Sequence, residues 1–121
     1  MKTTMLLTAF IIAIVIFCAC SKNSTGKDGS GGISFSCTGI SPKFSTEIQP
    51  ILNTVCSINS NCHGSGSTNF GGQLTTYAEV NAKKADIRAQ ILAGTMPQTG
   101  TITQAQINAF ICWIDGGAPN N

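Results

Sequence analysis

The chain has 121 residues, of which 42% are hydrophobic and 10% are charged, and its formal net charge is +2. This length suits one small domain and excludes a large multidomain enzyme. The weak, scattered charge excludes a nucleic-acid-binding surface. The unusual part of the composition is six cysteines beside a single histidine, because oxidising compartments use cysteines as disulfides or cofactor attachments.

Residues 1–19 have the pattern of a secretory signal peptide. Lys2 precedes an apolar run that ends at Phe17 and is shorter than the about 20 residues of a membrane-spanning helix. The small residue Ala19 before Cys20 resembles the cleavage site of bacterial lipoproteins. We therefore expect cleavage before Cys20 and a lipid on this cysteine that anchors the protein to a membrane of the cell envelope, facing the periplasm. An ordinary signal peptide or an uncleaved anchor is the alternative.

The next segment, residues 20–36, is rich in Ser, Gly and Lys and predicts a flexible tether. The domain is then expected to span residues 37–121. An apolar core alone is marginal at this size, and such domains commonly add disulfides, metals or a cofactor.

Three segments of the domain have helical periodicity. Apolar residues recur at i, i+3, i+4 and i+7 in residues 46–55, with Ser45 as the expected N-cap. A second helix is predicted over about 77–93, ended by Gly94, and a T-x-x-Q capping box that begins at Thr103 opens a third. No strand pattern is present, so the predicted class is all-α, with three or four helices.

Residues 57–76 consist almost entirely of Ser, Asn, Thr and Gly and predict a long loop. A loop of this length in a compact domain indicates either a wrong assignment of the elements or a non-protein group around which the loop wraps. The stretch 96–100 is predicted to be extended or turning, because Pro97 disfavours helix at the preceding residue.

Cys56, Cys62 and His63 form a C-x5-C-H motif at the start of this loop. A cysteine pair followed by histidine holds c-type haem: the thiols add across the haem vinyl groups, and the imidazole binds the iron. The usual spacing is C-x2-C-H. The intervening residues are mostly polar, and we expect them to bulge out as a flexible segment. A zinc site would need a fourth ligand from far away.

Met96 is the only methionine that follows the predicted signal peptide. It lies in a turn between two predicted helices, where a core-filling methionine is not expected. A thioether on the opposite face of the haem would complete the iron ligands, so Met96 is the candidate second axial ligand.

Several short motifs also occur in a distinctive order. These are Ile48-Gln49-Pro50-Ile51-Leu52, Cys62-His63-Gly64, Leu74-Thr75-Thr76-Tyr77, Met96-Pro97 and Trp113-Ile114-Asp115-Gly116-Gly117-Ala118-Pro119-Asn120-Asn121. Over about residues 44–121, the chain resembles the class I c-type cytochromes, and among them small bacterial lipoproteins with a planctomycete-type cytochrome c domain.

The resemblance implies a small cytochrome c-like fold with long loops around one covalent haem c. Cys56 and Cys62 would hold the haem, and His63 and Met96 would be the iron ligands. With Cys18 removed and Cys20 lipidated, two cysteines remain. We expect these, Cys37 and Cys112, to form a disulfide.

The implied function is one-electron transfer with redox partner proteins rather than enzymatic catalysis, since methionine ligation leaves no open coordination position. Two alternatives stay open. In a haem-free structural or binding lipoprotein, Cys56–Cys62 and Cys37–Cys112 would both be disulfides. In a haem sensor or a peroxidase-like protein, Met96 would be displaced from the iron.

Overall fold

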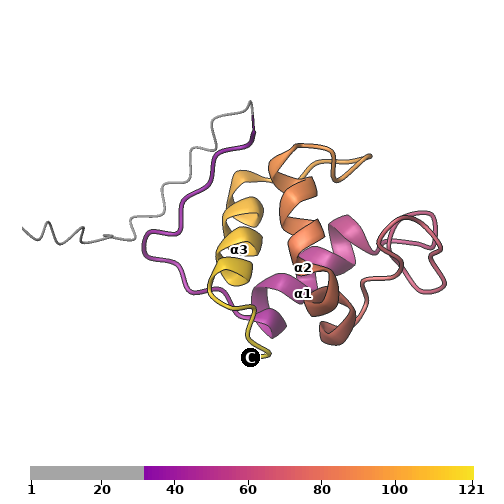
Figure 1. Cartoon of the computed structure of the whole chain (residues 1–121), viewed down its shortest axis with the longest axis horizontal. Helices are drawn as coiled ribbons and strands as arrows, with labels where there is room; N and C mark the ends of the chain where they lie inside the picture. Colours follow the sequence, from indigo (N-terminus) through magenta and orange to yellow (C-terminus); the bar gives the residue numbers. More distant parts are fainter. Residues whose placement is uncertain (1–31) are drawn as a thin grey trace, which may run out of the picture.

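The computed structural model describes residues 32–121, which are drawn in colour in Figure 1. The predicted signal peptide, the lipidation site at Cys20 and most of the tether lie outside these residues. The described part is helical and contains no strand, which confirms the all-α class. Within it, no helix has the length and apolar character needed to cross a membrane.

The first helical segment runs through residues 44–56. It consists of a π-helical turn, η1 (Phe44–Ile48), a short α-helix, α1 (Gln49–Ile51), and a second π-helical turn, η2 (Leu52–Cys56). Pro50 lies at the start of α1, where a missing backbone N–H is tolerated. The predicted helix is therefore present, but its hydrogen bonding is irregular on both sides of the proline.

The start of this segment differs from the prediction. The N-cap is Lys43 rather than Ser45, and its side chain forms no capping hydrogen bond. Instead, the amide of Phe44 donates to the side-chain Oδ1 of Asn121 at 2.8 Å, and the amide of Ser45 donates to the Asn121 carbonyl at 2.9 Å. A residue distant in sequence thus satisfies the first amides of the helix, which have no partner within it.

The second and third helices are α2 (Tyr77–Leu92) and α3 (Gln104–Asp115), and each begins with a capping box. In α3 the box formed by Thr103 and Gln106 is the predicted one. In α2, Thr76 and Glu79 form an equivalent box. Figure 1 shows α2 and α3 side by side, and α3 also packs against η1.

The centre of the core is Trp113 on α3, which is 1% exposed. Its ring lies 5.5 Å from the ring of Phe44 and 6.2 Å from that of Phe110, measured between centroids. The indole Nε1 donates to the Pro119 carbonyl at 2.9 Å, and the Tyr77 hydroxyl donates to the neighbouring Ala118 carbonyl at 2.9 Å. The buried aromatic residues therefore also hold the segment that follows α3, because each polar ring atom needs a partner.

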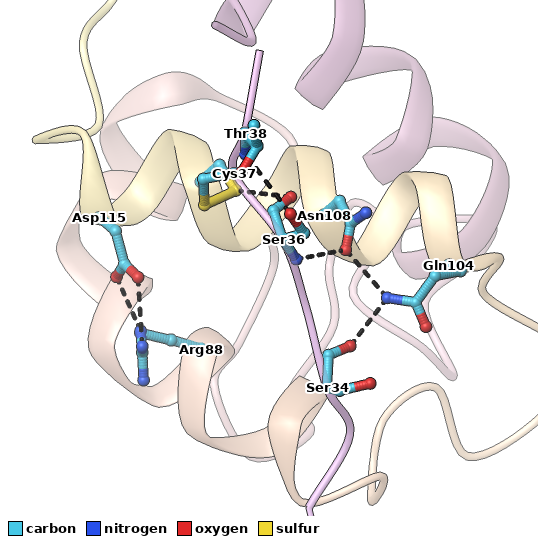
Figure 2. The surroundings of a disulfide bond; sticks show 9 residues. Ser34, Ser36, Cys37, Thr38, Arg88, Gln104, Asn108 and Asp115 are labelled. Carbon is cyan, nitrogen blue, oxygen red and sulfur yellow. Dashed lines mark hydrogen bonds and ion pairs between the residues drawn. A yellow bond between two sulfur atoms is a disulfide. The ribbon is translucent and has the colours of Figure 1, made fainter. Parts of the chain in front are cut away.

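Packing against the helices already includes residues 33–36, which precede the expected domain start at Cys37. Phe35 is buried at 5% exposure, and the Ile33 amide donates to the Leu92 carbonyl at 2.8 Å. Residues 33–36 belong to the domain because they run along α3, where the Ser36 amide donates to Asn108 (Figure 2).

The disulfide between Cys37 and Cys112 is present, as expected, and joins this N-terminal stretch to α3 (Figure 2). The cysteines are 75 residues apart in sequence. Closing a loop of this length stabilises the fold by about 4 kcal/mol in the chain-entropy model. Beside the disulfide, Arg88 of α2 pairs with Asp115 at the end of α3, with 2.8 Å between Nε and Oδ1.

Candidate functional site

All four predicted haem-site residues line a single cavity. Its volume is about 470 Å³, within the range of roughly 300–1,000 Å³ typical of small-molecule sites. Cys56 comes from the end of η2, Cys62 and His63 from the following loop, and Met96 from the connection between α2 and α3. Figure 1 shows the loop 57–76 at the right-hand side of the molecule.

The remaining wall of the cavity is mainly apolar. Its large hydrophobic side chains are Val55, Ile58, Phe70, Leu74, Ile87, Ile91 and Ile102. The two charged lining residues, Lys83 and Asp86, lie on α2 and are exposed. An apolar wall with a few polar groups is typical of a site for a small molecule or a cofactor.

The turn between the two cysteines is organised by Asn59. Its side-chain Oδ1 accepts hydrogen bonds from the amides of Asn61 at 2.9 Å and Cys62 at 3.2 Å. The His63 amide also donates to the Cys56 carbonyl at 3.0 Å. These bonds bring the two ends of the C-x5-C-H motif together, so the residues between the cysteines form a closed turn.

Gly64 is required by the close approach of two backbone segments. Its amide donates to the Asn59 carbonyl at 2.8 Å. A Cβ at this position would lie 2.7 Å from the carbonyl carbon and oxygen of Asn59, which is too close for any side chain. The glycine that follows His63 thus allows the loop to fold back on the turn.

The imidazole of His63 is oriented by the loop that follows it. Nδ1 lies 2.8 Å from the Gly72 carbonyl oxygen, which can only accept a hydrogen bond, so Nδ1 carries the proton. In the neutral ring this leaves the lone pair on Nε2. A histidine that binds a metal commonly donates its other ring N–H to a carbonyl in this way. Gly71 lies close by, and a Cβ there would be 3.5 Å from Cε1 of His63.

Both cavity cysteines carry free thiols. Burial, and to a smaller extent the neighbouring Cys62 thiol, raises the pKa of the Cys56 thiol to about 11. Cys56 is therefore an uncharged S–H group at neutral pH.

Met96 is half-buried at the cavity and is held in place through its backbone. Its amide donates to the Gln90 carbonyl at 3.3 Å. The preceding residue, Thr95, donates to the same carbonyl through its amide at 3.1 Å and through its hydroxyl at 3.0 Å. The last turn of α2 thus fixes the position of the methionine.

Glu79 organises the chain between Gly72 and α2. One oxygen of its carboxylate accepts from the amides of Thr75 and Thr76 at 2.8 and 2.9 Å, and the other accepts from the Gln73 side chain. These hydrogen bonds, led by that of Gln73, lower the pKa of Glu79 to about 2. The charged carboxylate of Glu79 therefore holds the residues that directly follow Gly72, and the carbonyl of Gly72 orients His63.

The Glu79→Gln variant should reveal this contribution through its pH dependence. A lowered pKa in the folded state stabilises the protein fully above the ordinary value of 4.5, and the contribution disappears as the pH falls to about 2. We expect the variant to unfold at lower urea concentration than the wild type at pH 7 and at a similar concentration near pH 2. Circular dichroism during urea titration at several pH values measures this difference. An equal difference at both pH values would contradict the assignment.

The sequence identified the sulfur and imidazole groups of the cavity, but not the residues whose hydrogen bonds hold the surrounding chain in place. Asn59, Gly72 and Glu79 were not anticipated, nor were the wall residues Ile58 and Phe70. Of these residues, Glu79 could have been identified, because the T-x-x-E pattern from Thr76 to Glu79 predicts a capping box.

Comparisons with protein-family models, curated proteins and solved structures find no match for this chain. Among residues 32–121, no three or more His, Cys, Asp or Glu side chains form a group that could hold a metal ion by themselves.

Proposed function

We propose that this protein is a monohaem c-type cytochrome of the cell envelope that transfers single electrons between redox partner proteins. The observation that carries the proposal is the meeting of four groups at one cavity. These are the thiols of Cys56 and Cys62, the imidazole of His63 and the thioether of Met96.

The chemistry of these residues fits covalent haem. Both thiols are free, as attachment requires. Each thiol would add across one vinyl group: its S–H bond and the π bond of the vinyl C=C would break, and one C–S bond and one C–H bond would form, so no oxidant or reductant is needed. The closed turn at Asn59 supports this use of the unusual spacing, because it brings the chain from Cys56 back to His63.

The ligand set favours electron transfer over catalysis. Haem brings the iron within its own ring, so the chain has to supply only the axial ligands. His63 would bind through Nε2, with Nδ1 held by the Gly72 carbonyl. Met96 would bind on the other side and leave no open position for a substrate. A haem held in this way supplies one-electron oxidation and reduction.

The alternative is a haem-free structural or binding lipoprotein that contains a second disulfide between Cys56 and Cys62. The free thiols of both residues favour the cytochrome proposal, because that alternative requires them to be bonded to each other.

The test is the absorption spectrum of the full chain produced in a host with the c-type haem maturation machinery. We expect the spectrum of a covalent haem, and a denatured protein band that retains haem-dependent peroxidase staining on a gel. Colourless protein from a competent host would overturn the proposal.

Membrane attachment has its own test, the Cys20→Ala variant. A lipid anchor contributes roughly 0.8 kcal/mol per buried CH2 group. We therefore expect the variant to leave the membrane fraction or to accumulate unprocessed, as measured by fractionation and mass spectrometry. Processed protein that stays in the membrane fraction would contradict lipidation at Cys20.

A further inference from the structure

Two large apolar side chains are exposed at the cavity. In the described part of the chain, Ile40, Ile58 and Phe70 are the exposed large hydrophobic residues, at 41%, 52% and 79% exposure. Single exposed apolar residues are normal on a protein surface. Here, however, Ile58 and Phe70 line the same cavity as the four groups of the proposed haem site, whereas Ile40 lies outside it.

The residues on each side of Phe70 lie against the Cys62-His63 segment. The Asn69 side chain donates to the Cys62 carbonyl at 3.2 Å and also donates to the Asn61 carbonyl. On the other side, Gly71 has a φ of +96°, and a Cβ there would touch the His63 ring. The position of Phe70 is therefore set relative to the imidazole.

Ile58 is positioned by the turn between the two cysteines. It directly precedes Asn59, whose side chain and carbonyl accept hydrogen bonds from the Cys62 amide at 3.2 and 3.1 Å. The additional residues of the C-x5-C-H motif thus contribute an apolar side chain to the cavity wall.

We propose that Ile58 and Phe70 contact the haem and shield it from water, so that the longer segment between the two cysteines is part of the binding site. This inference rests on the proposed cytochrome function. Less water around the haem disfavours the more highly charged oxidised form and raises the reduction potential. Contact with haem would also bury apolar area that is exposed without it.

The experiment compares three exposed residues in the haem-loaded full chain. Ile58→Ser and Phe70→Ser should retain full covalent haem but have lower reduction potentials than the wild type, measured by spectroelectrochemistry. Ile40→Ser is the matched control, since it removes a similarly exposed isoleucine away from the cavity, and its potential should equal that of the wild type. Phe70→Leu should largely keep the wild-type potential, because an apolar side chain still excludes water.

The outcomes separate the two proposals. If the wild type contains no haem, the proposed function and this inference both fail. If the wild type contains haem, and the Ile58→Ser and Phe70→Ser potentials match that of Ile40→Ser, only the inference is overturned. A serine variant that fails to retain haem while Ile40→Ser retains it would support a contact between that side chain and the haem.

Discussion

Replacing Cys62 with alanine should abolish most of the covalent haem, because its thiol directly precedes the imidazole that would bind the iron. Cys56→Ala probes the unusual spacing more sharply. If both thiols react, this variant should retain at most one thioether bond. Peroxidase staining of denatured protein measures the covalent haem, and the pyridine haemochrome spectrum reports how many vinyl groups have reacted.

Ser60→Ala is the matched control for these variants, since Ser60 lies in the same turn and is exposed. It should bind haem as the wild type does. A Cys56→Ala variant with the haemochrome spectrum of the wild type would show that the closed turn does not support two thioether bonds. Wild-type staining in Cys62→Ala would contradict the assignment of that thiol.

Replacing Met96 with alanine should remove the sulfur ligand and change the behaviour of the iron. The oxidised wild type should show the weak near-infrared band of sulfur-to-iron coordination, and the variant should lack it. Loss of the thioether should also lower the reduction potential and open the iron to added ligands such as carbon monoxide. Absorption spectra with and without carbon monoxide measure the near-infrared band and the ligand binding, and spectroelectrochemistry measures the reduction potential.

Gln98→Ala is a suitable control, because this residue lines the cavity in the same connection between α2 and α3. It should keep the near-infrared band. If the wild type itself binds carbon monoxide readily at neutral pH, the sixth coordination position is open. The sensor or peroxidase-like alternative would then replace electron transfer.

The elements that the sequence predicted well are those with local signals. The third helix begins at the expected capping box of Thr103, and the second ends one residue from its expected boundary. By contrast, the cap of the first helical segment comes from Asn121, and no local pattern can reveal a partner so distant in sequence. The packing of Phe35 was missed for the same reason, because its contacts lie in a different part of the chain.

In the candidate site, too, some groups could be predicted from the sequence and others could not. The thiols, His63 and Met96 could be named from the sequence because few side-chain types attach to haem or bind its iron, and the fold brings them to one cavity. The orientation of His63 depends on the Gly72 carbonyl, and every residue has such a group. Which carbonyl serves depends on how the loop folds, so the sequence alone did not identify it.

The attachment of residues 33–37 along α3 determines how the domain would bear mechanical load. A pull from the N-terminal side would first strain the hydrogen bond from Ile33 to Leu92 and then the buried ring of Phe35. The separation of this stretch from the helices would stop at Cys37, because the disulfide to Cys112 transmits the force to α3. The force would act early on the end of α2, which precedes Met96, because Ile33 is bonded there. It would not act directly on the turn that contains His63.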